Sequence, residues 1–86
     1  MPSDKIIPFP VLPLSSLRAG QRGNIVSVSE ADKDLYQKLS SMGAVSGTLV
    51  EVLRFAPLGD PVAVRLRGYE LALRRDEAAR IMVTPE

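Results

Sequence analysis

The stretch VAVRLRGYELAL, residues 62–73, alternates apolar and polar side chains on either side of Arg67 and Gly68. Such alternation is typical of β-strands, and a short break that contains glycine is typical of the turn between two strands. Folding the chain at this break pairs Val62 with Leu73, Val64 with Leu71 and Leu66 with Tyr69. The same register places Arg65 opposite Glu70 on the other face. One register thus yields an apolar face and an ion pair together, which predicts an antiparallel hairpin.

Two further strands are expected before the hairpin and one after it. Residues 47–55, GTLVEVLRF, are apolar on much of both faces, which is typical of a central strand. Residues 23–29, GNIVSVS, alternate and are rich in β-branched side chains, which favours a strand. Residues 81–85, IMVTP, form the last expected strand.

The segment between the first two strands has a helical period instead. Its apolar residues recur at positions i, i+4 and i+7 and therefore share one helix face; they are Leu35, Leu39 and Met42. Ser29 and Asp32 are both candidate N-caps, since their side chains can accept a hydrogen bond from the first turn. Gly43 stands where a glycine in the left-handed conformation would end the helix.

Two shorter segments complete the expected core. Leu14 and Leu17, three residues apart in a short turn, are expected to plug one end of it. Residues 74–81 predict a single helical turn whose inward residues are Ala78, Ala79 and Ile81. The order is therefore strand, helix, three strands, helical turn and strand. Five short strands with tight turns and one amphipathic helix are typical of a small closed β-barrel.

Length and composition restrict the function. The 86 residues form one small domain, which we place at residues 13–86 behind a Pro-rich extension at residues 1–12. The chain has no cysteine and no histidine, which excludes disulfides, thiolate or imidazole metal ligands, and catalysis by Cys or His. A net charge of +1 argues against a polyanion-binding domain. No apolar run is long enough for a membrane span and the N-terminus lacks signal-peptide features, so a cytoplasmic protein is expected.

Residues 39–83 resemble the FeoA family, the small cytoplasmic proteins of bacterial ferrous iron uptake. The resemblance rests on LSSMG at 39–43, Gly47, APLGDP at 56–61 and LRR at 73–75. The Leu-rich turn at residues 14–20 also fits the family's start, so the resemblance covers about residues 14–83. It implies an SH3-like β-barrel. It also implies a role beside FeoB, a membrane Fe(II) transporter that carries a cytoplasmic G domain.

The APLGDP loop is the first candidate site. Pro57 and Pro61 each fix φ and remove a backbone donor, while Gly59 permits a positive φ. Such a loop is either a rigid connection between two strands or a stiff element that presents side chains to a partner. The candidate partner-binding residues are Pro57, Leu58, Gly59, Asp60, Arg54 and Arg65. The candidate structural glycines are Gly43, Gly47 and Gly68.

The charged residues have two interpretations. The arginine-rich C-terminal half is either a solvated surface paired with glutamates or a patch that meets an acidic partner or lipid headgroups; the pairing glutamates would be Glu51, Glu70 and Glu77. Four carboxylates suggest an iron site but are better explained as caps and surface groups; they are Glu30, Asp32, Asp34 and Asp60. No metal site and no cofactor are assigned, and the isolated domain is expected to bind Fe(II) weakly at most.

The expected function is a non-enzymatic accessory role in ferrous iron uptake, through contact with the cytoplasmic region of a FeoB-type transporter. No nucleic acid is expected to bind, and membrane contact is expected only through the transporter. The sequence leaves two alternatives open. One is a regulatory SH3-like barrel that contacts a DNA-binding or signalling protein, and the other is an RNA-binding module. No phosphate-binding loop of the GxxxxGK[ST] type is present, so any nucleotide hydrolysis belongs to a partner.

Overall fold

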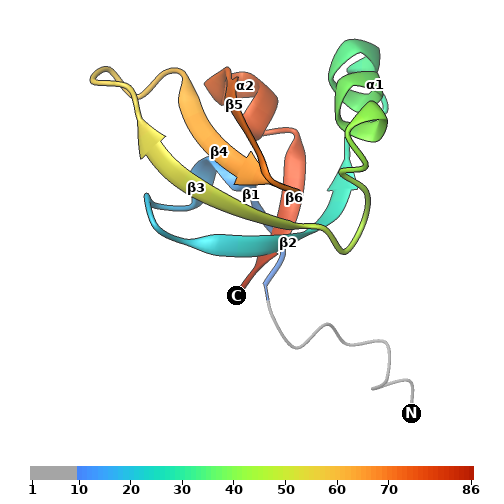
Figure 1. Cartoon of the computed structure of the whole chain (residues 1–86), viewed down its shortest axis with the longest axis horizontal. Coiled ribbons are helices and arrows are strands. Elements are labelled where there is room, and N and C mark those ends of the chain that lie inside the picture. Colours follow the sequence, from blue (N-terminus) through green and yellow to red (C-terminus); the bar gives the residue numbers. More distant parts are fainter. Residues whose placement is uncertain (1–9) are drawn as a thin grey trace.

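The computed structural model describes residues 10–86, so residues 1–9 of the expected N-terminal extension lie outside the described part of the chain. Figure 1 shows the strands in a strongly bent sheet with α1 beside it. The elements are β1 (Leu12–Pro13), the 3-10 helix η2 (Leu14–Ser16), β2 (Arg22–Val28), α1 (Lys33–Ser41), β3 (Leu49–Phe55), β4 (Val62–Leu66), β5 (Tyr69–Leu73), α2 (Arg75–Ala78) and β6 (Ile81–Pro85). The expected class, a mostly β domain with short helices, is confirmed.

The hairpin of β4 and β5 has the register that the sequence predicts. Val62 pairs with Leu73, Val64 with Leu71, Leu66 with Tyr69, and Arg65 with Glu70. Arg67 and Gly68 form a two-residue turn in which both φ angles are positive, at +48° and +81°. This conformation matches the right-handed twist of the flanking strands, so the hairpin closes without a longer loop.

The sheet is open rather than closed, and it has six strands rather than five. All pairs are antiparallel in the order β1-β6-β2-β3-β4-β5, and within residues 10–86 no pairing joins β1 to β5. The added strand, β1, is too short to show an alternating pattern, and Pro13 lacks the N–H that would extend it. The helical turns that follow the two edge strands, η2 and α2, contact each other instead.

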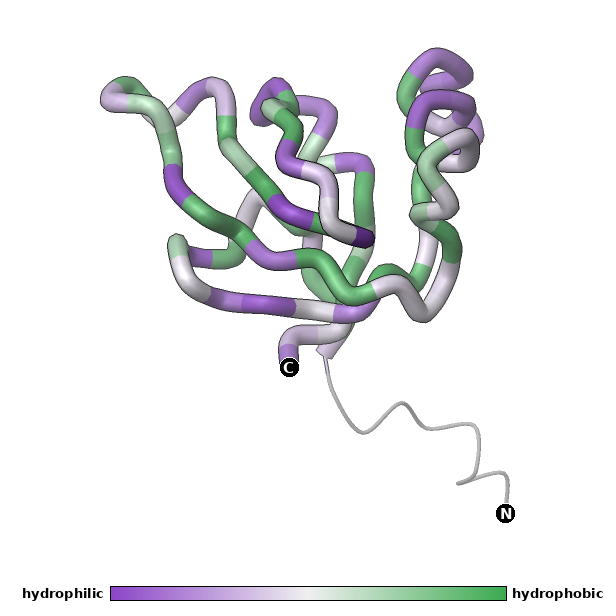
Figure 2. Tube along the Cα trace, in the orientation of Figure 1, coloured by the Kyte–Doolittle hydropathy of each residue, from purple (hydrophilic) through white to green (hydrophobic). Residues whose placement is uncertain are grey.

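The core is built almost entirely from aliphatic side chains. Figure 2 shows the alternation of hydrophobic and hydrophilic residues along the strands that surround it. Leu14 and Leu17 are buried as expected, and so are Ala78 and Ile81. Ala79 was expected to point inward but is exposed, because it lies about 100° around the helix from Ala78. The buried residues of the sheet and of α1 include Ile25, Leu35, Leu39, Val50, Val52, Val62, Val64, Leu66, Leu73 and Val83.

Backbone and side-chain caps define both ends of α1. At the start, Asp32 Oδ1 accepts a hydrogen bond from Leu35 N at 3.1 Å. At the end, Gly43 N donates to Ser40 O at 3.0 Å and Ala44 N donates to Leu39 O at 2.9 Å. These two bonds form a Schellman motif, which requires a left-handed residue after the C-cap, and Gly43 has φ of +76°. A single glycine therefore turns the chain from α1 toward β3.

Replacing Gly43 with valine is expected to lower the free energy of unfolding by about 1–2 kcal/mol, because a β-branched residue is strained at positive φ. Thermal unfolding should show it as a fall of roughly 4–8 °C per kcal/mol. Gly43→Asn is the control, since asparagine tolerates this conformation, and its free energy of unfolding should fall by less than that of Gly43→Val. A Gly43→Val variant that melts like the wild type would refute this helix end.

Candidate functional site

The loop between β3 and β4, residues 56–61, is held across its base by backbone hydrogen bonds. Gly59 N donates to Ala56 O at 2.7 Å, and Ala56 N donates to Pro61 O at 3.0 Å. Gly59 has φ of +86°, which a residue with a Cβ rarely adopts. Pro57 restricts the remaining freedom of the turn. The loop is therefore ordered by its own backbone as well as by its prolines.

Asp60 ties this loop to the helical turn α2. Its Oδ1 accepts a hydrogen bond from Arg75 N at 3.1 Å, across 15 residues of sequence. The Arg75 guanidinium also lies against the loop, since a Cβ at Gly59 would approach Arg75 Nη1 to 2.9 Å. The sequence suggested Asp60 as a partner-binding residue, whereas the structure gives its carboxylate a bond within the chain.

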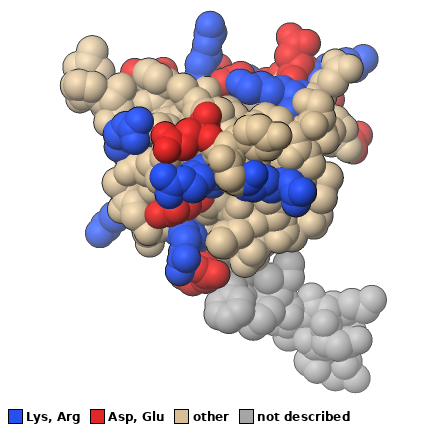
Figure 3. All heavy atoms as spheres, in the orientation of Figure 1, with Lys and Arg blue, Asp and Glu red and all other residues tan. Residues whose placement is uncertain are grey.

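Leu58 is the tip of the loop and is 95% exposed, more than any other large apolar residue described. Figure 3 shows the end of the loop as an uncharged projection from the body of the domain. Burying a leucine side chain is worth about 1.5–3 kcal/mol, and Leu58 gains none of this in the isolated domain. A braced loop thus presents one apolar side chain to solvent.

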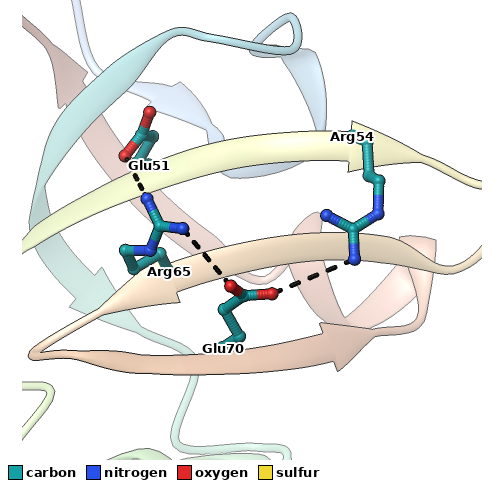
Figure 4. Close-up of polar contacts among 4 residues, drawn as sticks. All are labelled: Glu51, Arg54, Arg65 and Glu70. Atoms are coloured by element: carbon teal, nitrogen blue, oxygen red, sulfur yellow. Dashed lines mark hydrogen bonds and ion pairs between the residues drawn. The ribbon is translucent and has the colours of Figure 1, made fainter.

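The two arginines predicted near the loop belong to a row of ion pairs on the outer face of the sheet (Figure 4). Arg65 bridges two glutamates, with Nη1 3.4 Å from Glu51 Oε1 and Nη2 3.3 Å from Glu70 Oε2. Arg54 Nη2 lies 3.9 Å from the other oxygen of Glu70. The four charges sum to zero, which agrees with a solvated, paired surface. Exposed pairs of this kind contribute about 0–1 kcal/mol each.

A bulge in β3 puts Arg54 into this row. The register of β3 against β4 shifts between Val52 and Arg54, which leaves Leu53 as the extra residue. In a regular strand, Glu51 and Arg54 would face opposite sides because they are three positions apart. The bulge brings both to the outer face, where Figure 4 shows them on either side of Arg65 and Glu70.

The other suggested carboxylates do not converge on a metal site. Asp32 caps α1 and also binds Arg80, with Oδ2 2.8 Å from Nη1. Glu77 accepts a hydrogen bond from Arg74 N at 2.8 Å and so caps α2 rather than pairing with an arginine. Within residues 10–86 no three His, Cys, Asp or Glu residues lie close enough to hold a metal ion together.

No helix in that same range is long and apolar enough to cross a membrane.

A second apolar surface, which the sequence did not predict, lies between α1 and β2. Val26, Tyr36 and Val45 line a groove of about 200 Å³ between α1 and β2, and they are 37%, 42% and 56% exposed. These residues belong to three different segments, so no local pattern joins them.

The open, bent antiparallel sheet, with helical turns between its edges, is the fold of a small SH3-like domain. The FeoA domain family matches residues 12–85, and the chain belongs to this family. The expected family is confirmed. The Fe(2+) transport protein A/Fe(2+) transporter FeoB fusion protein of Porphyromonas gingivalis is 40% identical over 70 residues. That match covers 81% of this chain and 8% of the fusion protein, so this chain spans only a small part of that relative.

Two solved structures support the same assignment. The FeoA protein of Chlorobium tepidum shares 44% identity with a TM-score of 0.79, over 85% of this chain and 69% of that one. The zinc-complexed FeoA of Stenotrophomonas maltophilia shares 29% identity with a TM-score of 0.73, over 85% of this chain and 93% of that one. The latter is described as an SH3 domain protein, which confirms the SH3-like fold expected from the resemblance.

Removal of the Asp60 carboxylate is expected to destabilise the domain by about 1 kcal/mol, because Asp60→Ala deletes the bond to Arg75 N. Chemical denaturation provides the measurement. Glu30→Ala is the matched control, since Glu30 is exposed and makes no side-chain hydrogen bond or ion pair within residues 10–86. Equal stability of the two variants would show that the contact between loop and α2 contributes nothing.

Proposed function

We propose that this chain is a non-enzymatic, cytoplasmic accessory protein of ferrous iron uptake that acts by contact with the cytoplasmic region of a FeoB-type transporter. Membership of the FeoA family supports the iron-uptake part. The fusion of the two proteins in Porphyromonas gingivalis supports the choice of partner. The observation that carries the contact itself is Leu58, a leucine 95% exposed on a loop that the fold holds in place.

The order of the loop favours binding. A partner that captures a flexible loop must offset the entropy lost on ordering it, whereas this loop is already held by Gly59 N, Ala56 N and Asp60. Apolar anchors that enter a pocket carry much of the energy of protein interfaces. Burial of Leu58 in a partner pocket would return about 1.5–3 kcal/mol, which corresponds to roughly 10- to 150-fold in affinity.

Charge and metal chemistry support the proposal less strongly than the loop does. The row formed by Glu51, Arg54, Arg65 and Glu70 is internally neutral, so it offers a partner little net attraction. The chain has no histidine or cysteine to hold iron. Fe(II) is therefore the cargo of the partner in this proposal, and the domain acts through shape and apolar contact.

Leu58→Ser is expected to weaken binding to the purified cytoplasmic region of the transporter by about tenfold or more, with almost no change in the thermal midpoint. The reason is that Leu58 makes no core contact to lose. Val45→Ser, which removes an exposed apolar residue outside the loop, is the matched control and should bind like the wild type. Calorimetric titration and thermal unfolding on the same three preparations give both quantities.

Two results would contradict the proposal. One is an unchanged affinity for Leu58→Ser in a folded preparation. The other is a variant that melts early while its folded fraction binds normally, because the loop would then only connect two strands. Iron uptake by cells that carry the variant should follow the affinity rather than the stability.

A further inference from the structure

The hairpin leaves one strand edge of the sheet open. β5 is the last strand in the sheet order, and β4 is the only element with which it makes extensive contacts within residues 10–86. The two residues that flank a two-residue turn, here Leu66 and Tyr69, form a hydrogen-bonded pair. Along an antiparallel ladder, hydrogen-bonded pairs alternate with pairs whose backbone groups point away from the partner strand. Leu71 and Leu73 therefore also direct their backbone groups toward β4. Glu70 and Ala72 direct theirs away from the sheet.

The neighbouring strand supports this orientation independently. Val52 N donates to Gln21 O at 2.9 Å, and Val52 O accepts from Gly20 N at 2.7 Å. The backbone N–H and C=O groups of Val52 therefore point away from β4. The backbone groups of its partner Val64 must then point toward β5, where Val64 pairs with Leu71. The outward N–H and C=O groups of Glu70 and Ala72 take part in none of the hydrogen bonds between elements of residues 10–86.

The two edges of the sheet differ in protection. Proteins commonly protect edge strands with proline, lysine, bulges or very short strands. β1 has two residues, one of them Pro13, and is followed at once by η2. β5 has five residues, YELAL, with no proline, no lysine and no register shift against β4. Glu70 is its only charge, and that charge is already shared between Arg54 and Arg65.

We infer that β5 takes an extended segment of the transporter's cytoplasmic region as an added antiparallel strand, paired to the backbone of Glu70 and Ala72. This inference deepens the proposed function and rests on it. The added strand would carry apolar side chains at alternate positions. Those on one face would cover Tyr69, which is 55% exposed, and Leu71, which is half-buried.

The edge and the APLGDP loop form one continuous surface, which favours the transporter as the occupant. Arg54, just before the loop, binds Glu70 in β5, and Asp60 in the loop binds the backbone two residues after Leu73. A partner seated on Leu58 thus lies beside the end of the open edge. A second copy fits less well. Symmetric antiparallel pairing about Leu71 would set two like-charged Glu70 side chains diagonally opposite each other on one face.

Ala72→Pro tests the edge directly, because it removes an outward N–H and obstructs pairing while leaving the ladder with β4 intact. It should weaken binding to the transporter's cytoplasmic region by about tenfold. Ala72→Val, which fills the same position but keeps the N–H, should bind about tenfold more tightly than Ala72→Pro. Thermal unfolding verifies that both variants are folded.

Amide hydrogen exchange in the wild-type complex is the second measurement. At saturation, the amides of Glu70 and Ala72 should exchange at least about tenfold more slowly than in the free domain. If Leu58→Ser loses binding while Ala72→Pro and these two amides are unaffected, the edge inference fails and the proposed function stands. If the wild type does not bind at all, both fail. Protection that rises with the concentration of this chain alone would assign the edge to a second copy and overturn the inference.

Discussion

The alternation of inward and outward side chains along β3, β4 and β5 is the constraint on which the rest of the domain depends. Val50, Val52, Val64 and Leu66 are each at most 2% exposed. A shift of one residue in either register would expose these side chains and carry Arg65 into the core, at a cost of several kcal/mol for an unpaired charge. The single allowed register then fixes where every outward residue stands. The ion-pair row and the open edge are both consequences of it.

The same meander determines the functional surface. Because β3 and β4 must pair along most of their length, residues 56–61 have only a short span in which to reverse the chain. Hydrogen bonds at the base of the loop and the bond from Asp60 to Arg75 brace it from two sides. Its tip has no apolar neighbour to pack against, so Leu58 remains in solvent. The pairing of β3 with β4 therefore determines both the packing of the core and the exposure of Leu58.

Local patterns predicted the elements well, because the spacing of apolar residues within one segment distinguishes a helix from a strand. The hairpin register, the five longer strands and the position of α1 all followed from such patterns. Three features did not. The strand at Leu12 and Pro13 is too short to alternate, the bulge at Leu53 depends on how β3 meets β4, and the Asp60 contact joins residues 15 positions apart. The sequence singled out the APLGDP loop as a candidate partner surface, but which of its residues face outward needed the tertiary structure.

Methyl NMR with a soluble paramagnetic agent tests, without altering the chain, whether Leu58 enters a pocket of the transporter. In the free domain the Leu58 methyl groups should relax faster than those of Val45, because the two side chains are 95% and 56% exposed. On saturation with the transporter's cytoplasmic region, they should lose most of that relaxation while the Val45 methyl groups keep theirs. A saturated complex in which the Leu58 methyl groups remain as accessible as before would contradict the account.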